Sequence, residues 1–538
     1  MLGYTYKDLS QTEKHHRRNA LDALGHHVVL SQLAVALCAY AYRRLFCTRR
    51  KRDQKGFLRR LEWRLTRPLS WEDPESRSVG DFVVAVGWLV WMLWLVGRDA
   101  GDDYLHLTKA FGMAASANFP ALILLSMKRS PLRYIFSVSY EGKINYLHQG
   151  LAKIIYILLC THMALYLKFF WDSSRMKTRL LEFDVMCGVV GLVAMTVLST
   201  LAYPWVRTHY YRVFLVSHIV LSAVLLPLFY LHVTHLRTYI LTTTSLLLYD
   251  RVHRYISTIP VTATITLPTS TTLHITLTLP ATSRHAPTPV SHLILYIPTI
   301  TTRLASNPFT VASSTPTSLT IISRVRSTTT KQLAALAADN TLQLPAQIDA
   351  FYGDSPSLAT LADNFDRVVV IAGGVGGAWA VPWVRHLARE GALERCVFVW
   401  AVRSIGDVRW AVESEGTQGR VVAGKVELFV TGEREEEEGE EGEEGEEGVE
   451  MRDRLLGGRE GREDVITQVT AWGISRDRVY FERPDVDMLI EDAGKGGRRS
   501  VAVLACGPWA LGARVRRVVG EKVLRGDAAW VHVEEFAR

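Results

Sequence analysis

Cysteine is scarce in this sequence. The chain has six cysteines in 538 residues and no CxxC pair, so neither a disulfide framework nor a cysteine zinc site is indicated. The formal charge is +8, but no groove-reading motif or aromatic-interleaved basic patch accompanies it, which argues against a nucleic-acid partner. Catalytic-triad, metal-hydrolase and calcium-loop motifs are also absent from the sequence, so hydrolytic chemistry is not indicated.

Long apolar runs lie almost entirely before Asp250. A membrane-spanning helix needs about 20 largely apolar residues, and seven stretches are candidates: 27–46, 79–97, 108–127, 144–169, 183–203, 210–231 and 236–249. The first stretch lacks a small-residue cleavage site, so we expect a spanning helix rather than a signal peptide. Basic residues concentrate in 43–67, which predicts a cytoplasmic loop there and a cytoplasmic exit of the chain after the seventh span.

The remaining sequence predicts two water-soluble domains. Residues 251–345 alternate threonine with apolar residues, a period-two pattern typical of an antiparallel barrel or sandwich. Residues 346–538 alternate short apolar strands with helical stretches, which predicts a parallel α/β domain. Residues 433–450 are nearly all Glu and Gly, and we interpret them as a disordered insert without a catalytic role. The predicted domains are therefore 1–250 in the membrane, 251–345 and 346–538.

Four histidines in the membrane half have a repeated spacing. His148 and His162 lie fourteen residues apart in the fourth span, and His218 and His232 lie fourteen apart in the sixth. Fourteen residues of helix separate two side chains by roughly 21 Å with a rotation of only about 40°. Because the two spans run in the same direction, His148 lies level with His218 and His162 with His232. Haem iron takes two axial imidazoles in this manner, so two stacked haem sites are predicted.

An alternative interpretation is that these histidines are scattered polar residues satisfied by neighbouring helices, but the repeated spacing argues against it. His106, His209 and His235 have no partner at a matching depth and are interpreted as interfacial residues. His235 stays an alternative to His232 if the predicted span is out of register.

The membrane half resembles the ferric reductase and NADPH oxidase superfamily, and more closely the fungal ferric-chelate reductases. The similarity includes Lys109-Ala110-Phe111-Gly112, Asn118-Phe119-Pro120 and Ser139-Tyr140-Glu141. It implies that the four spaced histidines bind two b-type haems. The stretch that follows His148, Gln149 to Lys153, departs from the family pattern.

Asn307-Pro308-Phe309-Thr310 looks like the flavin-binding segment of the same family, in which His normally stands in place of Asn307. The resemblance implies an FAD domain of the ferredoxin-reductase type. A rigid proline and an aromatic ring can set the isoalloxazine plane, and Thr310 offers a hydroxyl. Arg324 is predicted to contact the pyrophosphate, beside a helix that Thr330 is expected to open.

Gly373-Gly374-Val375-Gly376-Gly377 follows an apolar strand and precedes a helical stretch. Such a turn lets the backbone approach a phosphate closely. The alternative is a tight strand-to-helix loop that has the same pattern but binds no nucleotide. The resemblance places two further segments at the nucleotide. Arg403 is expected to meet the 2′-phosphate of NADPH, and Cys506-Gly507-Pro508 is expected to bring Cys506 to the nicotinamide as a catalytic residue.

The resemblance implies a multi-pass, plasma-membrane oxidoreductase with cytoplasmic FAD and NADPH domains. Electrons would pass from NADPH through FAD and two haems to a ferric or cupric chelate outside, supporting metal uptake. Two alternatives stay open. An NADPH oxidase that reduces dioxygen to superoxide shares every motif named above, and an inactive membrane scaffold is consistent with the departures at Asn307 and Lys153.

Overall fold

The computed structural model describes residues 4–46, 56–71, 76–132, 144–280, 291–301, 307–326, 328–338, 341–352, 361–413, 417–432, 458–495 and 500–535. The chain divides into two compact units, Met1–Thr48 with Arg64–Ser257 and Arg49–Trp63 with Thr258–Arg538. The predicted acidic insert at 433–450 lies outside the described residues.

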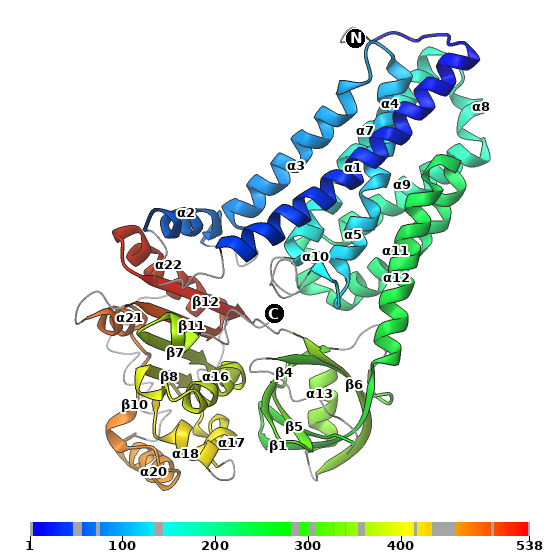
Figure 1. The fold of residues 1–538 in the computed structure, drawn as a ribbon. Helices are drawn as coiled ribbons and strands as arrows, with labels where there is room; N and C mark the ends of the chain where they lie inside the picture. Colours follow the sequence, from blue (N-terminus) through cyan, green and yellow to red (C-terminus); the bar gives the residue numbers. More distant parts are fainter. Residues whose placement is uncertain are drawn as a thin grey trace. The chain divides into compact units, whose positions relative to one another are not determined.

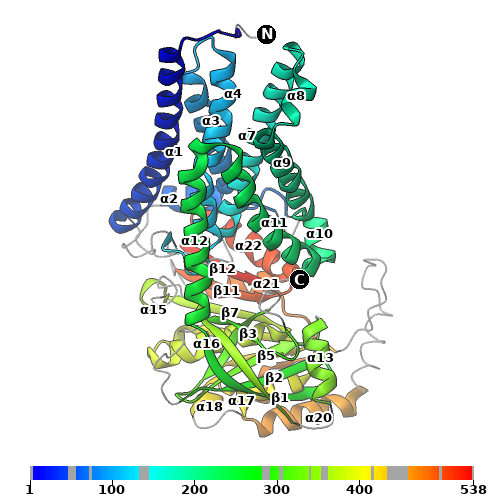
Figure 2. The ribbon, with the colours of Figure 1, turned by 90° about the vertical axis from the view of Figure 1, so that its right-hand side faces the viewer.

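The first unit is a bundle of helices (Figure 1). Its elements are α1 (Gln11–Phe46), α3 (Val79–Arg98), α4 (Tyr104–Ala117), α5 (Phe119–Ser126), α7 (Asn145–Asp172), α8 (Met176–Leu180), α9 (Phe183–Leu201), α10 (Pro204–His209), α11 (Tyr211–His232), η3 (Thr234–Leu236) and α12 (Arg237–Ile256). Helices α9 and α11 run side by side in both ribbon views (Figures 1 and 2). Helix α2 (Gly56–Thr66) crosses the boundary between the two units.

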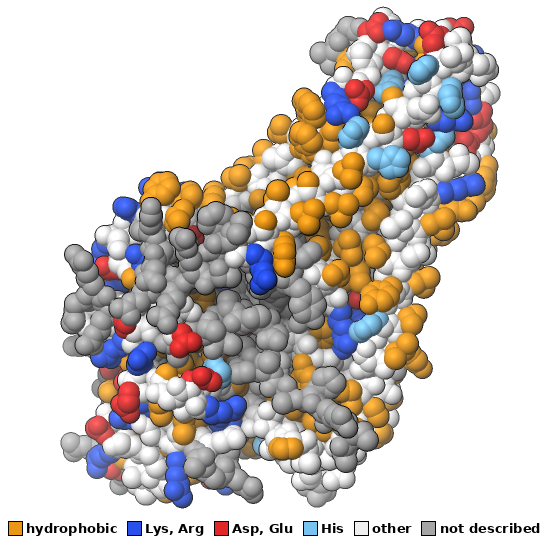
Figure 3. Space-filling view, viewed as in Figure 1, with side chains coloured by type: hydrophobic (Ala, Val, Ile, Leu, Met, Phe, Trp, Pro, Cys, Tyr) orange, Lys and Arg blue, Asp and Glu red, His pale blue; other side chains and the backbone are white. Residues whose placement is uncertain are grey.

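Five of the described helices are long and apolar enough to cross a membrane: Gln11–Tyr42, Val79–Arg98, Asn145–Asp172, Phe183–Leu201 and Tyr211–His232. Large apolar side chains on them face outward, for example Phe82, Trp94 and Val193, and Figure 3 shows apolar side chains spread over this bundle. Burying that surface needs an apolar solvent, which a bilayer supplies. The chain is therefore a multi-pass membrane protein.

Two of the seven predicted spans differ from the prediction. The predicted span 108–127 is two helices, α4 and α5, which meet at Asn118 with Pro120 in the first turn of α5. Proline removes a backbone donor, so a helix ends or breaks before it. The predicted span 236–249 is part of α12, which continues to Ile256 and carries too many polar residues to qualify by composition.

The side chain of Asn118 stabilises the break between α4 and α5 through hydrogen bonds. Its side chain is fully buried, and its Nδ2 donates to the Ala114 carbonyl at 2.7 Å. Its Oδ1 accepts from Gln32 at 3.0 Å and from Trp88 at 3.2 Å. One amide therefore ties together α1, α3 and the broken helix, where a polar group without partners is costly.

The second unit begins with a closed antiparallel barrel in the order β1-β2-β5-β4-β3-β6. Its strands are β1 (Ile259–Thr269), β2 (Thr272–Thr278), β3 (His292–Tyr296), β4 (Asn307–Ser314), β5 (Ser318–Arg324) and β6 (Leu342–Tyr352). In β1 the apolar Val261, Ala263 and Ile265 point inward between outward-facing threonines, as the alternation predicts. Helix α13 (Thr328–Leu336) appears within the outline of the barrel in Figure 1, and its Leu333 packs in the barrel core.

A parallel sheet in the order β10-β9-β8-β7-β11-β12 follows. Its strands are β7 (Arg367–Gly373), β8 (Cys396–Val402), β9 (Val426–Val430), β10 (Val479–Tyr480), β11 (Val501–Gly507) and β12 (Ala529–Glu535). Its helices are α15 (Leu361–Asn364), η4 (Gly374–Gly376), α16 (Gly377–Arg389), η5 (Leu393–Arg395), η6 (Ile405–Asp407), α17 (Arg409–Val412), α18 (Thr417–Ala423), α20 (Gly458–Ala471), η7 (Arg476–Arg478), α21 (Val486–Gly494) and α22 (Trp509–Arg525). The fold class predicted from the sequence is confirmed: a transmembrane bundle, a ferredoxin-reductase-like barrel and a parallel α/β domain.

The element ends differ from the predicted domain boundaries. Helix α12 continues six residues beyond 250 and ends at Ile256. Strand β6 runs through the boundary at 345/346 to Tyr352, and it pairs with both β1 and β3. Strand β6 closes the barrel, so the barrel needs these residues and the α/β part begins after them.

Candidate functional site

The structure brings His148 of α7 and His218 of α11 together. Their ring centroids are 6.4 Å apart with an interplanar angle of 63°. Two imidazoles that bind one metal ion from opposite sides, with metal–nitrogen distances of about 2 Å, have centroids about 6 Å apart. The observed separation therefore fits a single metal ion between the two rings.

Helices α7 and α11 also carry the second pair, and His162 lies within electrostatic range of His232. Nδ1 of His162 lies 2.7 Å from the Thr108 carbonyl oxygen on α4. Nδ1 of His232 lies 2.7 Å from the Asp184 carbonyl oxygen on α9. In the first pair, Nδ1 of His148 lies 3.0 Å from the carbonyl oxygen of Leu122.

These three contacts fix the tautomers of the rings. A carbonyl oxygen only accepts, so Nδ1 of His148, His162 and His232 carries the proton and Nε2 keeps its lone pair. Histidines that bind metals in proteins almost always donate their other nitrogen in this way. Nδ1 of His218 differs, because it is buried without a hydrogen-bond partner among the described residues.

Two glycines make room for the second pair. A Cβ at Gly112 would lie 2.8 Å from Cε1 and 2.9 Å from Nδ1 of His162, and a Cβ at Gly188 would lie 2.6 Å and 2.7 Å from the same atoms of His232. Each glycine stands four residues after the accepting carbonyl, at the position whose side chain would shield it. Glycine therefore exposes the carbonyls of Thr108 and Asp184 to the two imidazoles.

The other membrane histidines lie elsewhere. His235 is on η3, and its Nδ1 is 3.8 Å from Asp22 of α1. His232, not His235, makes the contact with the Asp184 carbonyl. His209 lies on α10 beside Trp205 with ring centroids 5.0 Å apart. His106 is buried in the first turn of α4.

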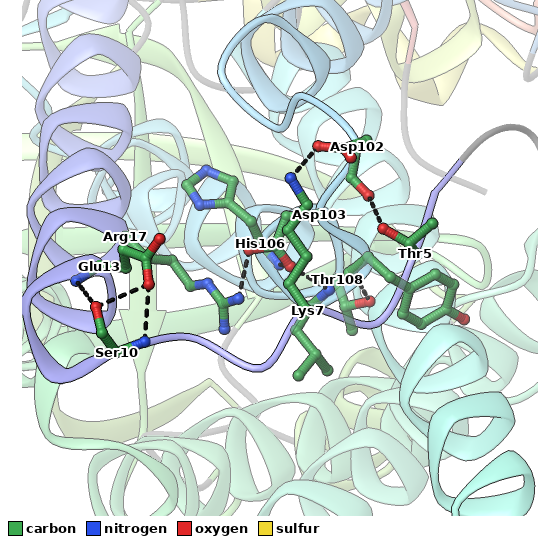
Figure 4. Close-up of polar contacts among 11 residues, drawn as sticks. Thr5, Lys7, Ser10, Glu13, Arg17, Asp102, Asp103, His106 and Thr108 are labelled. Carbon is green, nitrogen blue, oxygen red and sulfur yellow. Dashed lines mark hydrogen bonds and ion pairs between the residues drawn. The ribbon is translucent and has the colours of Figure 1, made fainter.

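A polar cluster ties the N-terminal segment to the start of α4 (Figure 4). Asp103 caps the helix by accepting from the backbone nitrogens of Leu105 and His106, and it pairs with Arg17 of α1. Asp102 pairs with Lys7. Asp103 lies little more than one helical turn before Thr108. The cluster therefore holds the start of α4, the helix whose Thr108 carbonyl contacts His162.

The glycine-rich turn forms the connection between β7 and α16. Gly374 has a φ of +54°, a left-handed conformation that favours glycine. A Cβ at Gly376 would overlap the carbonyl of Cys506, and a Cβ at Gly377 would overlap the Trp400 indole. Trp400 Nε1 donates to the Gly374 carbonyl at 2.9 Å. The turn therefore packs tightly on the ends of β8 and β11.

The other predicted nucleotide residues gather at the same edge of the sheet. A Cβ at Gly373 would lie 2.9 Å from Pro508 Cδ and 3.5 Å from Gly507 Cα. Arg403 is exposed directly after β8, which is the neighbour of β7 in the sheet. The carboxyl ends of parallel strands are where open α/β sheets bind ligands. Cys506 lies there too, but its side chain is fully buried.

The flavin segment differs in one respect from the prediction. Pro308 is exposed and Thr310 is half-buried, whereas Phe309 packs in the barrel core. Successive side chains of a strand point to opposite sides, so the Phe309 ring is not available to set a flavin plane. Residue 307 is the first of β4, paired with Leu295.

Arg324 ends β5 and is half-buried. Helix α13 begins at Thr328 rather than at the predicted Thr330. The Thr330 hydroxyl accepts from the backbone nitrogen of Arg326 at 2.9 Å and holds the turn before the helix. Arg324 and the helix start therefore lie close along the chain, and the contact of Arg324 with the pyrophosphate stays a prediction.

Sequence reasoning missed two sets of residues near this segment. His292 pairs in register with Thr310, and its ring stacks on Tyr352 at 5.8 Å. Arg385 of α16 donates to Ser313 Oγ at 3.2 Å and to the Ala411 carbonyl at 3.1 Å, which fastens the barrel to the α/β part. Neither set belongs to a local motif, because strand pairing and domain packing bring them together.

The fold combines a membrane bundle, a closed barrel and a parallel α/β part, with paired histidines in the bundle and a glycine-rich turn at the edge of the parallel sheet. Residues 111–229 match the ferric reductase like transmembrane component, and residues 365–520 match the ferric reductase NAD binding domain. The chain therefore carries two domains that match ferric reductase family models, one in the membrane half and one in the nucleotide-binding part.

Among similar proteins, a probable ferric reductase transmembrane component of Eremothecium gossypii is 27% identical over 62% of this chain and 52% of the relative. Ferric reductase transmembrane component 5 of Saccharomyces cerevisiae is 24% identical over 80% of this chain and 61% of the relative. The chain thus spans about half to three fifths of the length of these relatives. A flavohemoglobin structure from Malassezia yamatoensis is 15% identical, with a TM-score of 0.36, over 86% of this chain and 99% of that one.

Proposed function

We propose that this chain is a ferric-chelate reductase that moves electrons from cytosolic NADPH to a ferric or cupric chelate on the far side of the plasma membrane, with FAD and two b-type haems as cofactors. Its role would be to supply reduced metal for uptake. Curated relatives named ferric or ferric/cupric reductases favour this choice of acceptor.

The observation that carries the proposal is the geometry of the paired histidines. His148 and His218 face each other at 6.4 Å, and three of the four rings donate Nδ1–H to a helix carbonyl. That leaves Nε2 to bind iron, so His148 with His218 and His162 with His232 would each hold one haem. Haem iron, when bound, supplies one-electron transfer.

In the soluble unit, the protein's own residues bind and orient. We infer that Gly373, Gly374, Gly376 and Gly377 admit the NADPH phosphates, and that Arg403 meets the 2′-phosphate. Thr310 and Arg324 would contact FAD, whose flavin can accept two electrons as one hydride and release them one at a time. We further propose that Cys506, Gly507 and Pro508 bound the nicotinamide end, with the buried Cys506 backing the glycine turn through its carbonyl.

The charge pattern supports the proposed direction of electron transfer, from the cytoplasmic side to the far side of the membrane. Basic residues on the 43–67 segment favour a cytoplasmic position for that loop, which puts the start of α4 on the opposite side. The His162–His232 pair lies toward that end, because the ring of His162 contacts Thr108. An external acceptor would therefore meet the second haem near the cluster of Arg17 and Asp103.

The test is a reduced-minus-oxidised absorbance spectrum of membranes that contain the full chain, with NADPH as reductant. We expect a b-type haem signal that His162→Ala lowers by about half, because one of the two proposed haems loses a ligand. His209→Ala is the matched control, since His209 lies on α10 outside both pairs, and its signal should equal that of the unaltered protein.

Acceptor choice is measured in the same membranes by trapping ferrous iron from an impermeant ferric chelate, with and without superoxide dismutase. Insensitivity to the dismutase supports direct chelate reduction, whereas abolition by it indicates the NADPH oxidase alternative. A folded protein without haem would refute the proposal and favour the inactive scaffold.

A further inference from the structure

Helix α2 (Gly56–Thr66) has an exposed apolar face. Phe57, Leu61 and Leu65 recur every four residues, and Leu58 lies beside them within an arc of about 100°. Phe57 is 69% exposed, Leu58 44%, Leu61 42% and Leu65 39%. A short helix that exposes four large apolar side chains on one face is a candidate interaction surface.

The opposite face of α2 is already occupied. Trp63, about 180° around the helix from the centre of the apolar face, packs against the cluster that includes Val519 and Val523 of α22. A Cβ at Gly520 would overlap the Trp63 indole. Glycine at 520 therefore lets the indole lie directly on the backbone of α22, and α2 keeps its apolar face turned away from the α/β part.

Positive charge lies along one edge of that apolar face. Arg60 and Arg64 are exposed, and at 100° per residue they lie about 40° apart. Arg67 directly follows the last residue of the helix and is exposed too. The edge on the other side of the apolar face carries Glu62. A helix with an apolar face bordered by arginines is typical of helices that lie in the interface of a membrane.

The chain itself places the end of α2 beside the start of a membrane-crossing helix. Pro68 and Ser78 form a backbone bridge, and the backbone nitrogen of Val79, the first residue of α3, donates to the Arg67 carbonyl at 3.1 Å. Residues 65 to 69 therefore lie beside the N-terminal end of a candidate membrane span.

We propose that α2 lies in the membrane surface and binds anionic phospholipid. Phe57, Leu58, Leu61 and Leu65 enter the boundary between headgroups and acyl chains, and Arg60, Arg64 and Arg67 contact lipid phosphates and carboxylates. The occupant is lipid rather than a protein groove because α2 ends beside the start of a candidate membrane span and its apolar face is bordered by positive charge. This surface is separate from the haem and nucleotide sites, and its test does not depend on them.

The test uses the full chain in nanodiscs of phosphatidylcholine, with or without phosphatidylserine, that contain a lipid with a nitroxide near the headgroup. Cys38 and Cys47 are replaced by serine, and a fluorophore is attached at Leu61→Cys or, as the matched control on another side of the helix, at Thr66→Cys. We expect the nitroxide to quench the probe at 61 strongly and the probe at 66 weakly, with phosphatidylserine increasing the difference.

Arg60→Gln and Arg64→Gln should each lower the lipid-bound fraction of the helix about fivefold in phosphatidylserine discs, with little change in phosphatidylcholine discs. Equal quenching at 61 and 66, or quenching that does not respond to phosphatidylserine or to the arginine changes, would overturn the proposal. Disulfide formation between two Leu61→Cys chains without lipid quenching would overturn it too, and would indicate a second copy on this face.

Discussion

Replacing Gly188 by alanine should displace His232 from its ligand position. The new Cβ would lie 2.6 Å from Cε1 and 2.7 Å from Nδ1 of the imidazole, whereas two such atoms are comfortable at about 3.5–4.0 Å. The ring must therefore move by about 1 Å. The Nδ1 contact with the Asp184 carbonyl, now 2.7 Å, would lengthen past the range of a hydrogen bond.

Two effects of known size add together. Overpacking a tight site costs about 1–3 kcal/mol, and loss of the carbonyl contact that orients a metal-binding histidine lowers metal affinity about 10–100-fold. We expect Gly188→Ala to lose haem from the His162–His232 site and to keep it at the other pair. Gly112→Ala should act in the same way, because its Cβ would lie 2.8 Å from Cε1 of His162.

The assay is the haem content per chain of purified, monodisperse protein, measured by absorbance, together with the electron paramagnetic resonance signals of the two low-spin sites. Gly87→Ala is the control, since no atom lies within 4 Å of a Cβ there and alanine favours a helix by about 1 kcal/mol over glycine. Unchanged haem content and unchanged spectra in both Gly112→Ala and Gly188→Ala would refute the reasoning. Equal losses in Gly87→Ala would refute it as well.

Four further changes test other parts of the molecule. Arg403→Ala should raise the KM for NADPH by roughly tenfold or more, because a charge-assisted hydrogen bond contributes about 1.5–3 kcal/mol, and an equal rise for NADH would contradict its role. Gly377→Ala would place a Cβ against the Trp400 indole, so we expect weaker nucleotide binding in titrations and a stability loss of about 1–3 kcal/mol. Unchanged nucleotide binding would be evidence against a tight turn. Asn118→Leu should lower the thermal stability of the detergent-purified protein by about 1–2 kcal/mol, since it removes the acceptor of Gln32 and Trp88; no change would show that the amide is dispensable. Burial lowers the pKa of His274 below its ordinary value of 6.5. The unfolded chain therefore binds the proton more readily than the folded barrel, and the barrel loses stability as the pH falls below 6.5. His274→Gln should flatten this pH dependence of stability in thermal melts.

The order and type of the main parts follow from the amino-acid sequence alone. Apolar runs of spanning length, the threonine alternation before 345 and the short apolar strands after it each follow from one local periodicity, which depends on the solvent a segment faces. The fourteen-residue spacing also needed no tertiary information, because a helix converts spacing into depth and direction. The glycine turn at 373–377 was predicted on the same grounds, from a strand followed by a helix.

The local sequence pattern does not predict side-chain positions that depend on tertiary packing. The direction of the Phe309 side chain follows from barrel closure, and the burial of Cys506 follows from the helices that cover both faces of the sheet. The break at Asn118 was missed because hydropathy averages over it, although Pro120 was visible in the sequence.

The contacts that orient the histidines belong wholly to the tertiary structure. The sequence places His162 and His232 at one depth, but only the packing of α7 on α4 and of α11 on α9 brings their Nδ1 atoms to the carbonyls of Thr108 and Asp184. These contacts join residues 54 and 48 positions apart, which no local period can relate. A helix fixes which way a side chain points, whereas its hydrogen-bond partner is set by the neighbouring helix that packs against it.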